Sequence, residues 1–328
     1  MFFELFILLV GLGVIIKGGD LFVSASIRIA QFLRLPRVVT GSTLVSLATT
    51  SPELVVSITA GVKGESGIAL GNAVGSAVCN IGLVLATTAA LKHITVHPSE
   101  LRLPLTAMLL LGVVLFVITL DLRLSRMEGA ILLAVGVGYF VYDFFLRKRD
   151  VDPQDVAEAV AIEGDITAGH TWLNSRLGTS IQFCSGAGLV ILGSRLLVDS
   201  AVVLAERLGI SPLVIALTII AVGTSLPELV TAISSSRQDV SDLAVGNVLG
   251  ANIANLSLIV GTAASIDEVS MSRTTQLFNF PALLILMGGI AFLVLRKGTI
   301  TRRAGATLLF FYLLYLAGIL VLNTVMPS

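Results

Sequence analysis

The chain repeats its own sequence after 175 residues. Pro52-Glu53-Leu54-Val55 recurs as Pro227-Glu228-Leu229-Val230, and a Gly-x-x-x-Gly stretch that begins at Gly71 recurs from Gly246. The two copies align without a gap over residues 21–89 of the first half. A constant spacing over so long a stretch is typical of a duplicated folding unit. The repeat therefore predicts two halves with the same fold.

The composition places both halves in a membrane. Of the 328 residues, 55% are hydrophobic and 13% are charged, and the mean hydropathy is +0.97, whereas a soluble domain carries about 25% charged residues. A helix needs about 20 apolar residues to cross a bilayer. This length predicts an all-α membrane protein with ten spans, at residues 2–31, 37–62, 67–91, 101–120, 125–146, 178–206, 212–236, 243–265, 274–295 and 304–325. The first apolar run is interpreted as a retained helix, not a signal peptide.

The number of spans predicts how the halves are oriented. Residues 1–147 and 178–328 hold five spans each, and an odd number makes the second half enter the membrane inverted relative to the first. The polar segment 148–177 is interpreted as the linker between them. Inverted repeats are the plan of many secondary transporters, which bind their substrates where the repeats meet, near the middle of the bilayer.

Basic residues predict which side the linker faces. If the N-terminus is outside, fourteen Lys and Arg residues lie on the same side as the linker and five on the other side. Cytoplasmic loops carry the excess of basic residues. We therefore predict a multi-pass protein of the cell (plasma) membrane, with a cytoplasmic linker and with both termini outside.

Glu53 and Glu228 are the residues in these spans that most need an explanation. A charged side chain at the centre of a bilayer costs roughly 2.5–3.5 kcal/mol on insertion scales. Each glutamate follows a proline, which lacks an N–H and so frees the carbonyl of Ala48 or Gly223 from the helical hydrogen-bond pattern. Freed carbonyls are tolerated at this depth where something re-satisfies them, and Ca²⁺ binds six to eight carboxylate and carbonyl oxygens. The two motifs therefore predict broken helices that hold a cation.

Helical spacing brings further oxygen atoms to the two glutamates. Residues three, four and seven positions before each glutamate share its helix face, and the next span of each half carries a polar stripe with four-residue spacing. The predicted site residues are Ser46, Thr49, Thr50, Glu53, Ser76 and Asn80 in the first half, and Ala221, Thr224, Ser225, Glu228 and Asn255 in the second. We expect no sulfur or histidine nearby, which disfavours zinc and copper. Ser, Thr and Asn also join membrane helices to one another without binding ions.

These motifs resemble those of the cation/Ca²⁺ exchanger superfamily, and best those of its Na⁺/Ca²⁺ exchanger branch. That branch has two inverted five-helix repeats, each with a motif similar to Gly-Thr-Ser-Leu-Pro-Glu, which is intact at residues 223–228 and altered at residues 48–53. The resemblance implies that Glu53 and Glu228 bind Ca²⁺ together with the backbone carbonyls of Thr49 and Thr224. It also implies neighbouring Na⁺ sites around Ser46, Thr50, Ser76, Asn80, Ala221, Ser225 and Asn255.

This chain differs from the branch at two positions, and the resemblance also implies which helices move. The branch usually has Asp where this chain has Asn255, and often Ser where it has Ala251. The first span of each half is implied to be the element that slides when the site changes its accessible side.

The function expected from the sequence is secondary-active antiport, not an enzymatic reaction. Na⁺ would exchange for Ca²⁺ by alternating access, with the ions competing for the two central glutamates. No P-loop is present, so we expect no ATP and no cofactor, and the zero formal net charge gives no reason to expect nucleic acid. The alternatives are a Ca²⁺/H⁺ antiporter, an ion channel in which the same oxygens form a selectivity filter, and a membrane scaffold that transports nothing.

Overall fold

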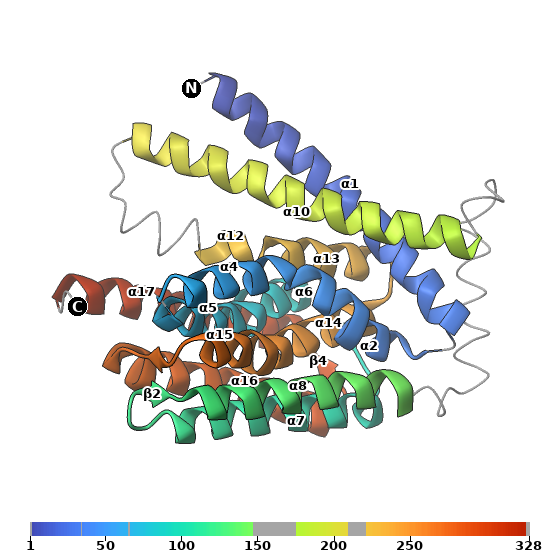
Figure 1. Ribbon diagram of the computed structural model, residues 1–328. Helices are drawn as coiled ribbons and strands as arrows, with labels where there is room; N and C mark the ends of the chain where they lie inside the picture. The colour runs from blue at the N-terminus through green and yellow to red at the C-terminus, as the bar shows by residue number, and fades with distance from the viewer. Residues whose placement is uncertain (1, 34, 65, 147–174, 209–220, 326–328) are drawn as a thin grey trace.

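The computed structural model describes residues 2–33, 35–64, 66–146, 175–208 and 221–325, and helices dominate these ranges (Figure 1). The helices of the first half are α1 (Phe2–Leu33), α2 (Arg37–Thr40), α3 (Ser46–Thr49), α4 (Ser51–Val62), α5 (Ser66–Cys79), α6 (Ala86–Leu91), α7 (Pro98–Ile118) and α8 (Arg126–Leu146). Those of the second half are α10 (Arg176–Arg207), α12 (Ala221–Thr224), α13 (Leu226–Arg237), α14 (Ser241–Ala254), α15 (Val260–Ile266), α16 (Phe280–Lys297) and α17 (Arg302–Val325). Four π-helical segments complete them: η1 (Gly41–Val45), η2 (Asn80–Leu85), η5 (Asn255–Ile259) and η6 (Thr275–Asn279).

Most of the predicted spans are present as apolar helices. Within the described ranges, eight helices are long and apolar enough to cross a membrane, and α2 to α4, bent by 48° at Thr50, add a ninth candidate. The predicted span 212–236 lies partly outside the described residues, which contain only its α12 and α13 portion. The chain is therefore a multi-pass membrane protein.

The predicted linker 148–177 lies almost entirely outside the described residues. Helix α10 begins at Arg176, within the last two residues of this predicted segment. Ser175 caps this helix by accepting a hydrogen bond from the backbone N–H of Gly178 at 3.0 Å, as serine does at helix N-termini.

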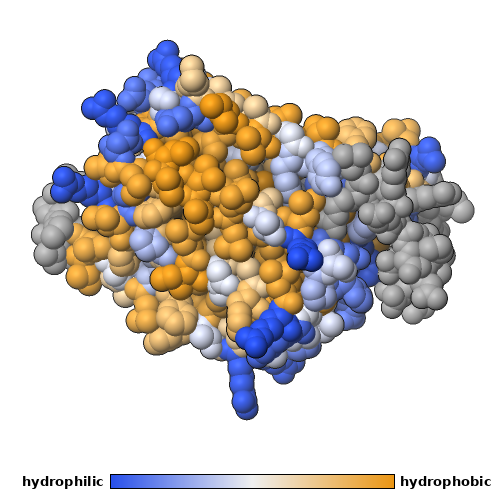
Figure 2. Space-filling model, turned by 90° about the horizontal axis from the view of Figure 1, so that it is seen from below, coloured by the Kyte–Doolittle hydropathy of each residue, from blue (hydrophilic) through white to orange (hydrophobic). Residues whose placement is uncertain are grey.

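The outward face of the helix bundle is apolar. Figure 2 shows a broad hydrophobic surface on the face that carries α7 and α8. Val113 and Val117 of α7 and Ile131 and Val135 of α8 are among the exposed side chains. A water-soluble chain rarely exposes so large an apolar area, so this face fits contact with lipid.

Several elements of the two halves correspond within the described residues. Helices α4 and α5 have the same lengths as α13 and α14, and η2 and η5 both begin at an asparagine of the repeat. Four two-residue strands interrupt the all-helical prediction: β1 (Ile94–Thr95) pairs with β4 (Thr299–Ile300), and β2 (Arg123–Leu124) with β3 (Val269–Ser270). Each pair joins the first strand of one half to the second strand of the other, which is a reciprocal arrangement. Strands this short carry no alternating pattern by which the sequence could reveal them.

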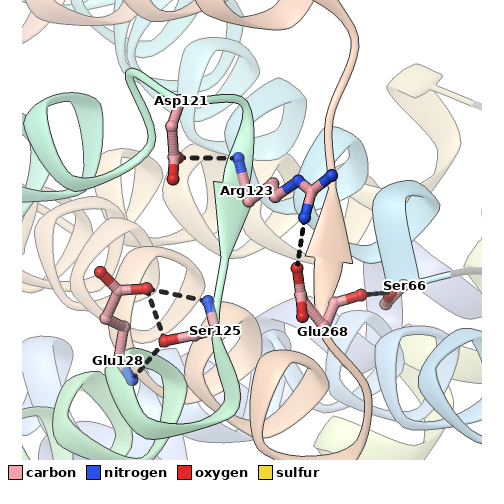
Figure 3. Close-up of polar contacts among 6 residues, drawn as sticks. All are labelled: Ser66, Asp121, Arg123, Ser125, Glu128 and Glu268. Carbon is pink, nitrogen blue, oxygen red and sulfur yellow. Dashed lines mark hydrogen bonds and ion pairs between the residues drawn. The ribbon is translucent and has the colours of Figure 1, made fainter.

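Side-chain contacts reinforce the β2–β3 pairing (Figure 3). The guanidinium of Arg123 lies 3.8 Å from the carboxylate of Glu268, and the Ser66 hydroxyl donates to the Glu268 carbonyl at 2.9 Å. Ser125 and Glu128 close the start of α8, because the carboxylate accepts from the Ser125 backbone N–H at 2.8 Å and from its hydroxyl at 2.7 Å. We call these contacts the β2–β3 clasp.

Helix α14 forms the centre of the bundle and is buried on all sides. It approaches η1 and α2 through the predicted Gly-x-x-x-Gly stretch. A Cβ atom added at Gly246 would lie 2.4 Å from the carbonyl oxygen of Val38, and one at Gly250 would lie 2.2 Å from that of Ser42. Small residues permit such close helix contact in membranes. This packing fixes the second half against the first beside the broken helices.

Candidate cation site

Both predicted helix breaks are present at equivalent positions. Thr50 separates α3 from α4 with φ −83° and ψ 3°, and Ser225 separates α12 from α13 with φ −92° and ψ 8°. Pro52 and Pro227 lie in the first turn of the helix that follows, where the N–H that proline lacks would have no partner in the helix anyway. Each proline therefore starts a new helix, and the glutamate after it lies in that helix's first turn.

The carbonyl predicted to be free at the first break is not free. The Ser51 hydroxyl donates to the carbonyl of Ala48 at 2.8 Å, so this oxygen has a partner within its own turn. The backbone N–H of Thr50 bonds the carbonyl of Ser46 at 2.9 Å, and that of Leu54 bonds the carbonyl of Thr50 at 3.1 Å. Helical hydrogen bonds are therefore made both before and after the Thr49 carbonyl, in spite of the break.

The two glutamates are buried, one in each half of the chain. Each is 1% exposed, and their carboxylates are close enough to interact electrostatically. Among the described residues, Oε2 of Glu53 and both carboxylate oxygens of Glu228 are buried without a hydrogen bond of good geometry, and the Thr49 hydroxyl lies near the Glu228 carboxylate. Burial of a charge without a partner is costly, and two like charges increase that cost. A cation between the carboxylates would remove both penalties.

Amide groups from the neighbouring helices add further oxygen atoms. Asn80 begins η2, which packs against α13, and Asn255 begins η5, which packs against α4. Among the described residues, Oδ1 of Asn80 and both amide atoms of Asn255 are buried without a hydrogen-bond partner. Each asparagine therefore lies on a segment that contacts the glutamate-bearing helix of the opposite half.

Asn252 is a residue of this region that the sequence prediction missed. Its Oδ1 accepts from Nδ2 of Asn80 at 3.0 Å, and its own Nδ2 donates to the carbonyl of Ala77 at 3.2 Å. This contact holds the Asn80 amide so that its oxygen is left for another ligand. The repeat gave no signal for Asn252, because the equivalent position in the first half is Ala77 itself.

The predicted hydroxyl groups are buried and retain acceptor capacity. Ser46 donates to the carbonyl of Ser42 at 2.8 Å, Thr50 to that of Ser46 at 2.7 Å, and Thr49 to that of Ser46 at 3.2 Å. A hydroxyl has one donor and two acceptor lone pairs, so a proton donated within the helix leaves the oxygen able to contact a cation. The Ser225 hydroxyl is 1% exposed and makes no hydrogen bond of good geometry among the described residues, and the Cys79 thiol is its polar neighbour.

The remaining predicted residues lie close to these. Thr49 also contacts Oδ1 of Asn247 at 3.2 Å across the two halves. Ser76 is buried on α5. Thr224 is half-buried and ends α12, which Ala221 begins.

The expectation that no sulfur lies nearby is wrong. The Cys79 thiol is buried directly before Asn80 and lies beside the Ser225 hydroxyl. It also accepts a hydrogen bond from the Tyr312 hydroxyl at 3.6 Å. Other helices pack closely around this part of the chain. Cys79 and the adjacent Asn80 are therefore both buried, although they contact different neighbours. Within the described residues, no group of three or more His, Cys, Asp or Glu side chains could hold a metal ion, so a zinc-type site is still disfavoured there.

A cavity of about 170 Å³ lies beside the two breaks. It lies between α10 and α4, and its inner wall includes Pro52, Thr224 and Pro227. Arg195 and Asp199 of α10 line the opposite wall. The cavity therefore borders residues of both broken helices.

Comparison with known proteins identifies the class of protein that has this fold and these motifs. The profile of the sodium/calcium exchanger protein family matches residues 3–145 and again residues 179–321. The chain therefore belongs to the sodium/calcium exchanger family.

Relatives along nearly the full length agree with this assignment. The inner membrane protein YrbG of Escherichia coli (strain K12) is 34% identical over 81% of this chain and 82% of its own length. The sodium/calcium exchanger MaX1 of Methanosarcina acetivorans is 29% identical over 94% and 96%. Among solved structures, the sodium–calcium exchanger NCX_Mj superposes with a TM-score of 0.81 and 28% identity, covering 96% of this chain and 98% of that one. The fold is therefore that of a sodium–calcium exchanger.

Proposed function

We propose that this protein exchanges Na⁺ for Ca²⁺ across the cell membrane by alternating access, with the ions competing for Glu53 and Glu228. The observation that carries the proposal is the pair of buried glutamates, which together present three carboxylate oxygens that make no hydrogen bond of good geometry among the described residues. Crystals of the similar exchanger NCX_Mj were soaked with Na⁺, Ca²⁺ and Sr²⁺, which supports the same class of ions here.

The proposed ligands divide between the two kinds of ion. Ca²⁺ binds both glutamates and the backbone carbonyls of Thr49 and Thr224, because a divalent ion favours carboxylate and carbonyl oxygens. Na⁺ ions occupy neighbouring positions that share the glutamates. Their further ligands are Ser46, Thr50, Ser76, Asn80, Ala221 through its backbone, Ser225 and Asn255.

Charge balance gives this arrangement its coupling. Two carboxylates neutralise one Ca²⁺, so a set of Na⁺ ions that uses the same carboxylates excludes it. Three Na⁺, the family's usual number, would leave one excess positive charge. Exchange at that stoichiometry is electrogenic.

The architecture proposed for the whole chain is ten spans in two inverted repeats, residues 1–147 and 178–328. The reciprocal pairing of β1 with β4 and of β2 with β3 supports a two-fold relation between the halves. The family profile, which matches each half separately, supports it as well. In the proposed orientation both termini are outside and the linker 148–177 is cytoplasmic, as the distribution of basic residues favours.

The coupling ion can be tested in proteoliposomes that contain the purified protein. With Na⁺ inside and none outside, we expect Ca²⁺ uptake that persists when the pH is clamped on both sides. Uptake that follows an imposed proton gradient and ignores Na⁺ would instead make the protein a Ca²⁺/H⁺ antiporter. Discrete single-channel currents in a planar bilayer would indicate a channel.

Removal of the Ser225 hydroxyl tests whether this group binds Na⁺ or only stabilises the fold. Because its only polar neighbour among the described residues is the Cys79 thiol, a weak hydrogen-bonding group, Ser225→Ala should leave the thermal stability measured without ions nearly unchanged. Because the proposed site uses the Ser225 hydroxyl as a Na⁺ ligand, its removal should raise the Na⁺ concentration needed for half-maximal exchange several-fold.

The matched control is Thr231→Val, within the helix α13 that Ser225 precedes. The Thr231 hydroxyl is buried but bonds the carbonyl of Pro227 at 2.7 Å, so its removal should leave the Na⁺ dependence unchanged. An unaltered Na⁺ dependence in Ser225→Ala would remove Ser225 from the proposed site.

A further inference from the structure

The two halves differ in how α1 and α10 meet the helices that carry the glutamates. Helix α1 packs directly on α13: a Cβ atom at Gly19 would lie 2.6 Å from Cγ1 of Val230. The Ser234 hydroxyl donates to the Asp20 carboxylate at 3.0 Å, and the Ser24 hydroxyl donates to Oε1 of Gln238 at 3.1 Å. These contacts close the interface between α1 and α13. One of the two hydrogen bonds has a charged acceptor, and the other joins two neutral groups.

The equivalent interface in the other half, between α10 and α4, is open. The 175-residue repeat places Arg195, Asp199, Thr59 and Lys63 where Asp20, Ser24, Ser234 and Gln238 lie in the closed interface. All four side chains of the open interface are exposed, and the cavity of about 170 Å³ lies between the two helices. Lys63 and Asp199 form no ion pair with any residue in the described part of the chain.

Helices α1 and α10 pack on each other through repeat-equivalent glycines, so they can act as one unit (Figure 1). A Cβ atom at Gly186 would lie 2.7 Å from the backbone nitrogen of Phe22, and one at Gly193 would lie 2.7 Å from that of Ile15. Gly18, the equivalent of Gly193, would place its Cβ 2.8 Å from that of Leu189. Because the backbones interlock, movement of α1 away from α13 carries α10 towards α4.

We propose that Lys63 and Asp199 form an ion pair that closes the α10–α4 interface when the α1–α13 interface opens. This inference rests on the alternating access proposed above and adds the residues that hold its second state. In the repeat, Asp199 and Lys63 take the places of Ser24 and Gln238, which bond each other in the closed interface. Rocking of one unit against the other exchanges the open and closed interfaces of inverted repeats. The two closed states are therefore held by different chemistry, hydrogen bonds in one and an ion pair in the other.

Loss of the ion pair should shift the protein towards the state described here. In the proposed orientation the α10–α4 cavity faces outside, so Lys63→Gln and Asp199→Asn should each increase the apparent affinity for external Ca²⁺ by about two- to fivefold, the effect of an exposed ion pair. The exchanged pair, Lys63→Asp with Asp199→Lys, should return the affinity to that of the unmodified protein. Arg123→Gln, which removes an exposed ion pair of the β2–β3 clasp (Figure 3), is the matched control and should have no effect.

A cysteine pair tests the contact itself. In a Cys184→Ser background, Lys63→Cys with Asp199→Cys should be joined during exchange by a short bis-thiosulfonate reagent, which forms a disulfide with each thiol and releases sulfinate. The cross-link should stop Ca²⁺ flux until a reductant cleaves these disulfides. If the reduced variant exchanges ions normally but never cross-links during turnover, the proposed contact is wrong. Unchanged Ca²⁺ affinity in Lys63→Gln and Asp199→Asn would also overturn it. So would a charge-exchanged double variant whose affinity differs from that of the unmodified protein by the sum of the two single effects. Absence of Na⁺-driven flux in the unmodified protein would instead contradict the proposed function.

Discussion

We expect Glu53→Gln and Glu228→Gln each to lower Ca²⁺ affinity by at least tenfold. Each change keeps the size of the side chain and removes one of the two charges proposed to neutralise the ion. Interactions of a charged group of this kind contribute about 1.5–3 kcal/mol, and about 1.4 kcal/mol is a factor of ten in affinity. Equilibrium binding of radioactive Ca²⁺ to the purified variants measures the effect directly.

The same two variants should still fold. Neither Oε2 of Glu53 nor the Glu228 carboxylate makes a hydrogen bond of good geometry among the described residues, so removal of the charge relieves a desolvation penalty. Thermal unfolding in the absence of ions should occur at the same temperature or higher. Glu268→Gln, which changes an exposed carboxylate of the β2–β3 clasp, is the control and should bind Ca²⁺ normally. Undiminished Ca²⁺ binding in either Glu53→Gln or Glu228→Gln would contradict the site assignment.

Gly250→Ala should have the second-largest effect, through the packing of α14. The added Cβ would lie 2.2 Å from the carbonyl oxygen of Ser42 and 2.6 Å from its Cα, and both are backbone atoms that cannot rotate away. Overpacking of this kind costs about 1–3 kcal/mol, and here it also separates α14 from η1 beside the site. We expect a clearly lower unfolding temperature in detergent and strongly reduced exchange.

Gly288→Ala provides the comparison for this packing prediction. Gly288 is exposed on α16, and a Cβ there would meet no atom within 4 Å among the described residues. Alanine favours a helix over glycine by about 0.8–1.0 kcal/mol, so this variant should be as stable as the parent or more so. Equal stability of Gly250→Ala and Gly288→Ala would show that α14 does not depend on this close contact.

The sequence predicted the helices well because membrane spans are long and apolar. The ends of α5 and α14 fall within two residues of the predicted spans 67–91 and 243–265 once η2, α6, η5 and α15 are included. The breaks at Thr50 and Ser225 followed from Pro52 and Pro227, since proline disrupts a helix whatever surrounds it. Two-residue strands such as β1 leave no such pattern in the sequence.

The repeat allowed prediction only of those site features that both halves share. Glu53 and Glu228, or Asn80 and Asn255, appear in both copies and are buried in the structure. Asn252 and Cys79 occur in one half only, and both contact the region through tertiary packing that no local spacing encodes. The open α10–α4 interface and the closed α1–α13 interface also differ, although the repeat alone would predict that they are alike.

The central claim is that Na⁺ and Ca²⁺ compete for the same two glutamates. The most direct test is equilibrium binding of radioactive Ca²⁺ to the purified protein at increasing Na⁺ concentration, with the double variant Glu53→Gln, Glu228→Gln measured in parallel. We expect a single class of Ca²⁺ site that Na⁺ empties completely and cooperatively, and no specific Ca²⁺ binding by the double variant. Ca²⁺ binding that Na⁺ does not displace, or that the double variant retains, would contradict the proposed site.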